Sequence, residues 1–209
     1  MIFNPSHPPD SCFIIDIENF VNQVPYLDIE MARGLDYILD CFMPTETVHR
    51  FSFGDLEKSA AAVASRFGGN HHELRQNWRY ALAQRGITHV DLPWTGRSDA
   101  SDYKIREFIF QAKDAYPSLT RFVLVTSDAG FIRCCTNLRH DGCDVCLVIT
   151  GFTSSRYADA CSSILSLPLL VTNRPHRGTI QTIIEDSNYM VHQLAKSRNA
   201  LASQTLLPL

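Results

Sequence analysis

The stretch Phe13-Ile14-Ile15-Asp16-Ile17-Glu18-Asn19 is a short apolar run that ends in acidic and amide side chains. A second run, Phe122-Val123-Leu124-Val125-Thr126-Ser127-Asp128, has the same layout much later in the chain. Each run is typical of a parallel strand that helices cover on both faces, because such strands are apolar almost throughout. A carboxylate at the end of such a run lies at the carboxyl edge of the sheet, where open α/β sheets bind ligands. We therefore expect Asp16 and Asp128 to share one acidic site; the alternative is that each only caps a helix.

Length and composition narrow the class of protein. The chain has 209 residues, enough for one α/β domain with a sizeable core and a modest appendage. Its formal net charge of −3 argues against a broad basic surface for nucleic acid but does not exclude RNA, because a few Arg and Lys side chains could still hold a phosphate backbone. The seven cysteines follow no small-scaffold spacing, and no run reaches membrane-spanning length. We expect a soluble, intracellular protein of the cytoplasm with reduced thiols.

Strand-like and helix-like segments alternate along the chain. The expected strands are 12–17, 47–53, 87–92, 121–126 and 144–149. The expected helices are 27–42, 56–67, 73–84, 99–115 and 131–140. This alternation predicts an α/β fold, a doubly wound parallel sheet sandwiched by helices.

The last third of the chain is less regular. We expect a short helix over 154–165, a further apolar segment over 167–171 and an extra C-terminal helix within 179–200. That helix could dock on the sheet domain, bind a protein partner or mediate self-association. The expected division is a loose N-terminal arm over 1–11, one α/β domain over 12–171, and a linker with the C-terminal helix over 172–209.

A third acidic segment lies between the two strand ends. Asp99 and Asp102 are three residues apart, so they share a face at the start of the helix expected there. Carboxylates gathered at one edge raise each other's pKa, an arrangement that is costly unless a hard cation such as Mg²⁺ or Mn²⁺ lies among them. Metal held by carboxylates suits in-line attack on a phosphodiester.

Several of these segments also match a known pattern. In chain order, these segments are Asp16-x-Glu18-Asn19, Asp102 at a helix start, Leu-Val-Thr-Ser-Asp-Ala-Gly-Phe over 124–131, Leu138-Arg139-x-x-Gly142, and Ser155-x-Tyr157-Ala158-Asp159. Together they resemble the NYN domain, a family of PIN-like ribonucleases. The resemblance covers residues 12 to 170 and leaves out the C-terminal helix.

The resemblance implies metal-dependent hydrolysis of RNA, with single-stranded RNA as the substrate. Asp16, Asp102 and Asp128 match the metal-binding positions, and Asn19 matches a polar residue that would orient a ligand or water. The family usually has a further Asp two residues after the position of Asp128, where this chain has Gly130. Asp99 could supply that oxygen. The alternative is a degenerate NYN domain that binds RNA or protein without cutting.

Other motifs carry weaker indications. Asp16-x-Glu18 is also similar to the opening of haloacid-dehalogenase-like phosphotransferases, but that family expects Asp at the second position. Cys143-x-x-Cys146 lies in an expected strand, which points its two thiols to opposite faces. The pair His71-His72 starts a helix and has no third metal ligand nearby in the sequence. Arg97, Lys104, Arg133 and Arg139 could contact phosphates, and Trp94 could stack on a base.

Overall fold

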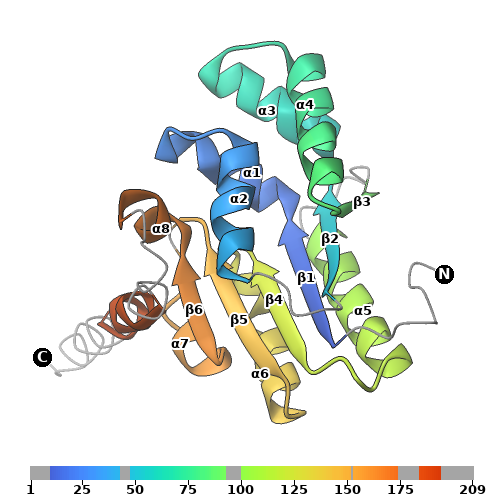
Figure 1. Ribbon diagram of the computed structural model, residues 1–209, viewed down its shortest axis with the longest axis vertical. Helices are drawn as coiled ribbons and strands as arrows, with labels where there is room; N and C mark the ends of the chain where they lie inside the picture. Colours follow the sequence, from blue (N-terminus) through green and yellow to red (C-terminus); the bar gives the residue numbers. More distant parts are fainter. Residues whose placement is uncertain (1–9, 43–47, 93–99, 152, 174–183, 194–209) are drawn as a thin grey trace, which may run out of the picture.

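A six-stranded, fully parallel sheet forms the centre of the chain (Figure 1). The computed structural model describes residues 10–42, 48–92, 100–151, 153–173 and 184–193. The strands are β1 (Ser11–Asp16), β2 (Val48–Gly54), β3 (Thr88–Asp91), β4 (Arg121–Val125), β5 (Asp144–Ile149) and β6 (Ser163–Ser166). Their order is β3-β2-β1-β4-β5-β6, so the direction of winding reverses between β1 and β4. Ligands of open α/β sheets bind at the carboxyl ends of the strands at such a switch point.

Helices cover both faces of the sheet (Figure 1). The elements on one face are α1 (Ile17–Gln23), the 3₁₀ turn η1 (Val24–Leu27), α2 (Met31–Cys41), α3 (Leu56–Phe67), α4 (His71–Gln84) and α8 (Leu167–Asn173). Those on the other are α5 (Ala100–Ala115), the 3₁₀ turn η2 (Ala129–Phe131), α6 (Ile132–His140) and α7 (Tyr157–Ala160). The predicted doubly wound sheet is therefore confirmed.

The strand β1 explains how one sheet carries two cores. Cys12 and Ile14 pack with α5 and α6, whereas Phe13 and Ile15 pack with α1 and α2. Successive side chains of a strand point to opposite faces, so a continuous apolar run fills both layers. All four side chains are at most 1% exposed.

Most expected elements are confirmed, with errors at three places. β1 ends at Asp16, and α1, which was not predicted, begins at the next residue. The region 154–165 holds only the short helix α7 before it enters the unpredicted strand β6. The apolar segment expected at 167–171 belongs to the helix α8. Residues 1–9 of the predicted arm and 174–183 of the predicted linker lie outside the described residues.

The predicted C-terminal helix is present over 184–193 and docks on the edge strand β6. The backbone N–H of Ile164 donates to Oδ1 of Asn188 at 2.9 Å, and that of Ser166 donates to Oγ of Ser187 at 3.0 Å. Val191 is buried among the residues of the sheet face that α5 covers. Unpaired N–H groups on an edge strand can recruit other strands, so this helix protects the edge. In the ranges described here, no helix is long and apolar enough to cross a membrane.

Candidate functional site

Asp16 is the innermost carboxylate at the carboxyl edge. It ends β1, caps the start of α1 and is 4% exposed. Its Oδ1 accepts a 3.2 Å hydrogen bond from the backbone N–H of Asn19, and its Oδ2 accepts a 2.9 Å bond from the hydroxyl of Thr126. Burial raises the pKa of Asp16 to about 7; the two hydrogen bonds oppose that rise, and the charges of Asp102 and Glu18 add to it.

Asp128 follows β4, the strand that pairs with β1 in parallel, so it lies at the same carboxyl edge of the sheet as Asp16. Its Oδ1 caps η2 by accepting a 2.7 Å bond from the backbone N–H of Gly130, and its own backbone N–H donates to the Thr126 hydroxyl at 3.1 Å. The hydroxyl of Tyr157 donates to its carbonyl oxygen. One Thr126 hydroxyl thus connects the Asp16 carboxylate to the backbone of Asp128.

Asp102, in the first turn of α5, directs its carboxylate toward Gly130 and Asp128. A Cβ atom added to Gly130 would lie 3.0 Å from Oδ2 of Asp102 and 3.2 Å from Oδ1 of Asp128. The carboxylates of Asp102 and Asp128 therefore meet in the space that a side chain at position 130 would fill. One turn further along α5, the guanidinium of Arg106 donates to the Gly130 carbonyl at 3.0 Å, which holds η2 against α5.

Asn19 and Glu18 hold the surrounding elements together. Oδ1 of Asn19 accepts bonds from the Ser127 backbone N–H at 2.9 Å and from the Thr150 hydroxyl at 3.1 Å, which joins the carboxyl ends of β1, β4 and β5. Oε1 of Glu18 accepts bonds from the Ser101 hydroxyl at 2.9 Å and from the Asp55 backbone N–H at 3.2 Å. Both side chains therefore connect the elements around Asp16, Asp102 and Asp128, the three carboxylates that form the acidic edge of the sheet.

The structure brings together three of the predicted acidic residues, and Asp99 lies outside the described residues. Asp16 and Asp102 are close enough for electrostatic repulsion, and Asp102 and Asp128 meet at Gly130. Within the described ranges, however, these three do not form a group with all ligand atoms inside 4.8 Å. Mg²⁺ keeps several waters and usually takes only one or two carboxylates directly, so direct ligation by all three side chains is not a requirement for such an ion.

Two of the basic residues predicted near the edge, Lys104 and Arg139, have protein partners, whereas Arg133 is exposed on α6. Nζ of Lys104 pairs with Glu107 at 2.8 Å, and Arg139 donates to the carbonyl of Asp159 at 2.9 Å. Arg97 and Trp94 lie outside the described residues. Sequence reasoning overlooked Arg106, whose only signal was its position one helical turn after Asp102.

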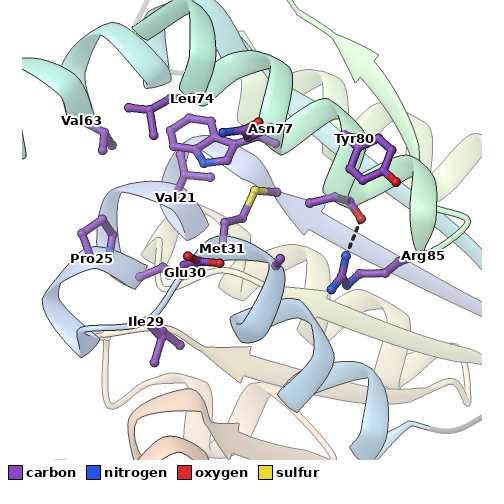
Figure 2. A pocket seen from close by; sticks show the side chains of 14 residues that line it. Val21, Pro25, Ile29, Glu30, Met31, Val63, Leu74, Asn77, Tyr80 and Arg85 are labelled. Atoms are coloured by element: carbon purple, nitrogen blue, oxygen red, sulfur yellow. Dashed lines mark hydrogen bonds between the residues drawn. The ribbon is translucent and has the colours of Figure 1, made fainter. Parts of the chain in front are cut away.

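Two hollows lie apart from the three aspartates. The one in Figure 2 has a volume of about 550 Å³ and separates α1, η1 and α2 from α3 and α4, with Val21, Met31 and Leu74 among its apolar lining. Another, of about 740 Å³, lies near the polar strand ends at Thr150 and Gly151 and has a mostly apolar lining that includes residues of α8 and the C-terminal helix.

Comparison with known proteins identifies the family. The NYN domain profile matches residues 14–168. The chain belongs to the NYN domain family. The NYN family is a PIN-like nuclease family, and the six-stranded parallel sheet agrees with that fold.

Solved structures support the fold alone. A protein of unknown function from Vibrio parahaemolyticus superposes with a TM-score of 0.52 at 15% identity, over 78% of this chain and 96% of that chain. A glucose-6-phosphate dehydrogenase bound to its substrate gives a TM-score of 0.32 at 9% identity, over 68% of this chain and 30% of that chain, which is too low to support an argument. No curated protein matches the chain.

Proposed function

We propose that this NYN domain is a ribonuclease that depends on a divalent metal and cleaves single-stranded RNA. The main support is the approach of the Asp102 and Asp128 carboxylates across Gly130, beside the buried Asp16 at the switch point of the sheet. A cation bound among these negative groups would offset their repulsion.

Mg²⁺ or Mn²⁺ would be held by Asp16, Asp102 and Asp128, with Asp99 as a further candidate oxygen donor. A cation bound there activates water and stabilises the charge that develops on a phosphodiester during in-line attack. The chain's own contribution is positioning. Thr126 orients Asp16, and Arg106 fixes the carbonyl of Gly130 between α5 and η2.

Asn19 has a positioning role in this proposal. Its Oδ1 is already used by Ser127 and Thr150, so its effect on the reaction passes through the segment that carries Asp128. Replacing Asn19 would therefore disturb the geometry of the acidic edge rather than remove a group that contacts RNA.

The test combines metal titration with conservative substitutions. Single-stranded RNA labelled at one end is incubated with full-length protein, with Mg²⁺, Mn²⁺ or a chelator. We expect cleavage only with metal, and its loss in Asp16→Asn and Asp128→Asn, which keep shape but remove a charge. Asp114→Asn, on the exposed end of α5, is the matched control. Cleavage that persists in both active-site variants would refute the proposal.

A binding-only NYN domain is the second candidate. Two observations favour it: Gly130 offers no carboxylate, and the three aspartates do not converge within 4.8 Å in the described chain. In that case the protein would retain single-stranded RNA in a binding assay, and neither Mg²⁺ nor Mn²⁺ would yield shorter products.

A further inference from the structure

A cluster of metal-binding side chain types lies outside the acidic edge, between α3 and α4. Nε2 of His71 lies 3.5 Å from Oε1 of Glu57, and Nδ1 of His72 lies 3.8 Å from the same oxygen. One ligand atom from each residue falls within 4.8 Å of the others. Sequence reasoning found no third ligand for the histidine pair because Glu57 is distant in the chain and only the packing of α3 on α4 supplies it.

Local structure explains the convergence. Asn70 caps α4 by accepting a 3.0 Å bond from the backbone N–H of His72, so both histidines stand at the first two positions of the helix. Glu57 occupies the first turn of α3. The two imidazole rings are 4.0 Å apart between centroids and tilted by 39°, so both reach toward the same carboxylate.

The distances between the ring nitrogens and the Glu57 oxygen are close to those of a tetrahedral metal site. With bonds of about 2.0 to 2.2 Å, the ligand atoms of a tetrahedral site lie roughly 3.3 to 3.6 Å apart. The Glu57 oxygen is already near that distance from both ring nitrogens. The side chains of His71 and Glu57 are 41% and 43% exposed, and that of His72 is 69% exposed, so small rotations could close the site around an ion from solvent.

Arg75 gives the carboxylate a fixed orientation. Its guanidinium donates to Oε2 of Glu57, which leaves Oε1 facing the two histidines. Such an outer partner orients a ligand and is a common feature of metal sites. Arg75 is also on α4, so both oxygens of Glu57 are directed at that helix.

We propose that Glu57, His71 and His72 form a surface site for a borderline transition-metal ion, represented by Zn²⁺, which joins the start of α3 to the start of α4. Two imidazole nitrogens and one carboxylate oxygen leave a fourth position for water. This donor set favours Zn²⁺ and similar ions, whereas sites made only of oxygen favour Mg²⁺ or Mn²⁺. The site is therefore chemically distinct from the acidic edge, and neither depends on the other.

The experiment is a calorimetric titration of chelator-treated, full-length protein with ZnCl₂, in millimolar MgCl₂ to saturate oxygen-only sites. We expect one Zn²⁺ per chain. His71→Ala and Glu57→Gln should weaken binding by at least the roughly tenfold to hundredfold loss that follows removal of an outer partner. His140→Ala is the matched control, because His140 is an exposed histidine 3.7 Å from the single carboxylate of Asp141. Asp16→Asn should also bind Zn²⁺ normally.

Three results would overturn the proposal: wild-type protein that binds no Zn²⁺, a His71→Ala/His72→Ala double variant that binds it unchanged, or loss of binding in Asp16→Asn alone. Circular dichroism verifies that each variant is folded. If Glu57→Gln is unfolded, His72→Ala replaces it, since that side chain is the most exposed of the three. RNA cleavage is not the readout, so failure here would leave the proposed nuclease function intact.

Discussion

The hydroxyl of Thr126 donates a 2.9 Å hydrogen bond to Oδ2 of Asp16 across the junction of β4 and β1. The same oxygen accepts a 3.1 Å bond from the backbone N–H of Asp128. Thr126 is fully buried, so water cannot replace either bond. A neutral residue that provides no metal ligand thus connects the carboxylate of Asp16 to the backbone that carries Asp128.

Thr126→Val should impair function more than its small change in shape implies. Valine keeps the volume, but it leaves the Asp128 N–H without an acceptor and removes a donor from Asp16. The pKa of Asp16 should rise further because this hydrogen bond now lowers it. We expect metal affinity and any RNA cleavage to fall by roughly tenfold to a hundredfold, and the free energy of unfolding to fall by about 1 to 3 kcal/mol.

Manganese titration and thermal melts measure both effects. Thr136→Val is the control, because the Thr136 hydroxyl donates to the Ile132 carbonyl on an exposed part of α6. That variant should change neither metal affinity nor cleavage. Equal behaviour of the two variants would mean that Thr126 does not position the acidic edge.

Gly130→Ala tests whether the lack of a side chain makes room for the carboxylates. The backbone of Gly130 has no left-handed φ, so alanine meets no backbone strain. Its methyl group would instead lie 3.0 Å from Oδ2 of Asp102 and displace that carboxylate. We expect weaker metal binding and cleavage, with unfolding changed by less than about 1 kcal/mol.

The matched control for Gly130→Ala is Gly34→Ala. A Cβ atom there would lie 3.2 Å from the ring of Phe20, so the crowding is similar but the neighbour is an apolar side chain and not a carboxylate. Gly34→Ala should therefore change stability but not metal affinity. Gly130→Asp extends the test: a third carboxylate in the same space should destabilise the metal-free protein and enlarge the stabilisation by Mn²⁺. Unchanged metal affinity in both Gly130 variants would contradict this view of the position.

The strand ends were predictable because their signal is local. An apolar run followed by Asp16 or Asp128 implies a buried parallel strand with a carboxylate at its edge, and the register of β1 with β4 then brings the two together. The helix α1 was overlooked because it begins with no loop after β1. Its buried residues Ile17, Phe20 and Val21 do follow helical spacing, but the first of them also continues the strand pattern.

The rest of the site depends on contacts between residues that lie far apart in the sequence. Arg106 is placed against Gly130 only once α5 lies beside η2. Likewise, Asn19 meets Thr150 only because β5 follows β4 in the sheet. The strand β6 has only four residues and lies next to a helix on either side in the chain, which explains why a helical pattern was expected through it.

Asn188→Ala should open the protected edge of the sheet. Its carboxamide oxygen is the acceptor for the Ile164 N–H, so alanine leaves that donor without its partner in the helix. We expect a loss of about 1 to 3 kcal/mol in unfolding free energy and faster hydrogen exchange at Ile164. Exposed Tyr189→Ala, on the same helix, is the control and should change neither. Slow exchange at Ile164 in Asn188→Ala would show that the Asn188 side chain does not protect this N–H.

The buried carboxyl of Asp16 should make the metal-free protein less stable as pH rises. Its folded-state pKa of about 7 lies above the ordinary value of 3.8, so between these limits the folded chain holds a proton that the unfolded chain has released. Stability falls with pH wherever the folded state binds more protons, so this contribution is fully present below about pH 4 and is lost as pH rises through 7.

Denaturant melts in chelator from pH 5 to pH 8 should show that decline, and Asp16→Asn, which cannot titrate, should flatten it. Millimolar Mn²⁺ should also reduce it, because a cation stabilises the ionised form. A slope that is the same in Asp16→Asn as in the wild type would assign the pH dependence to other groups.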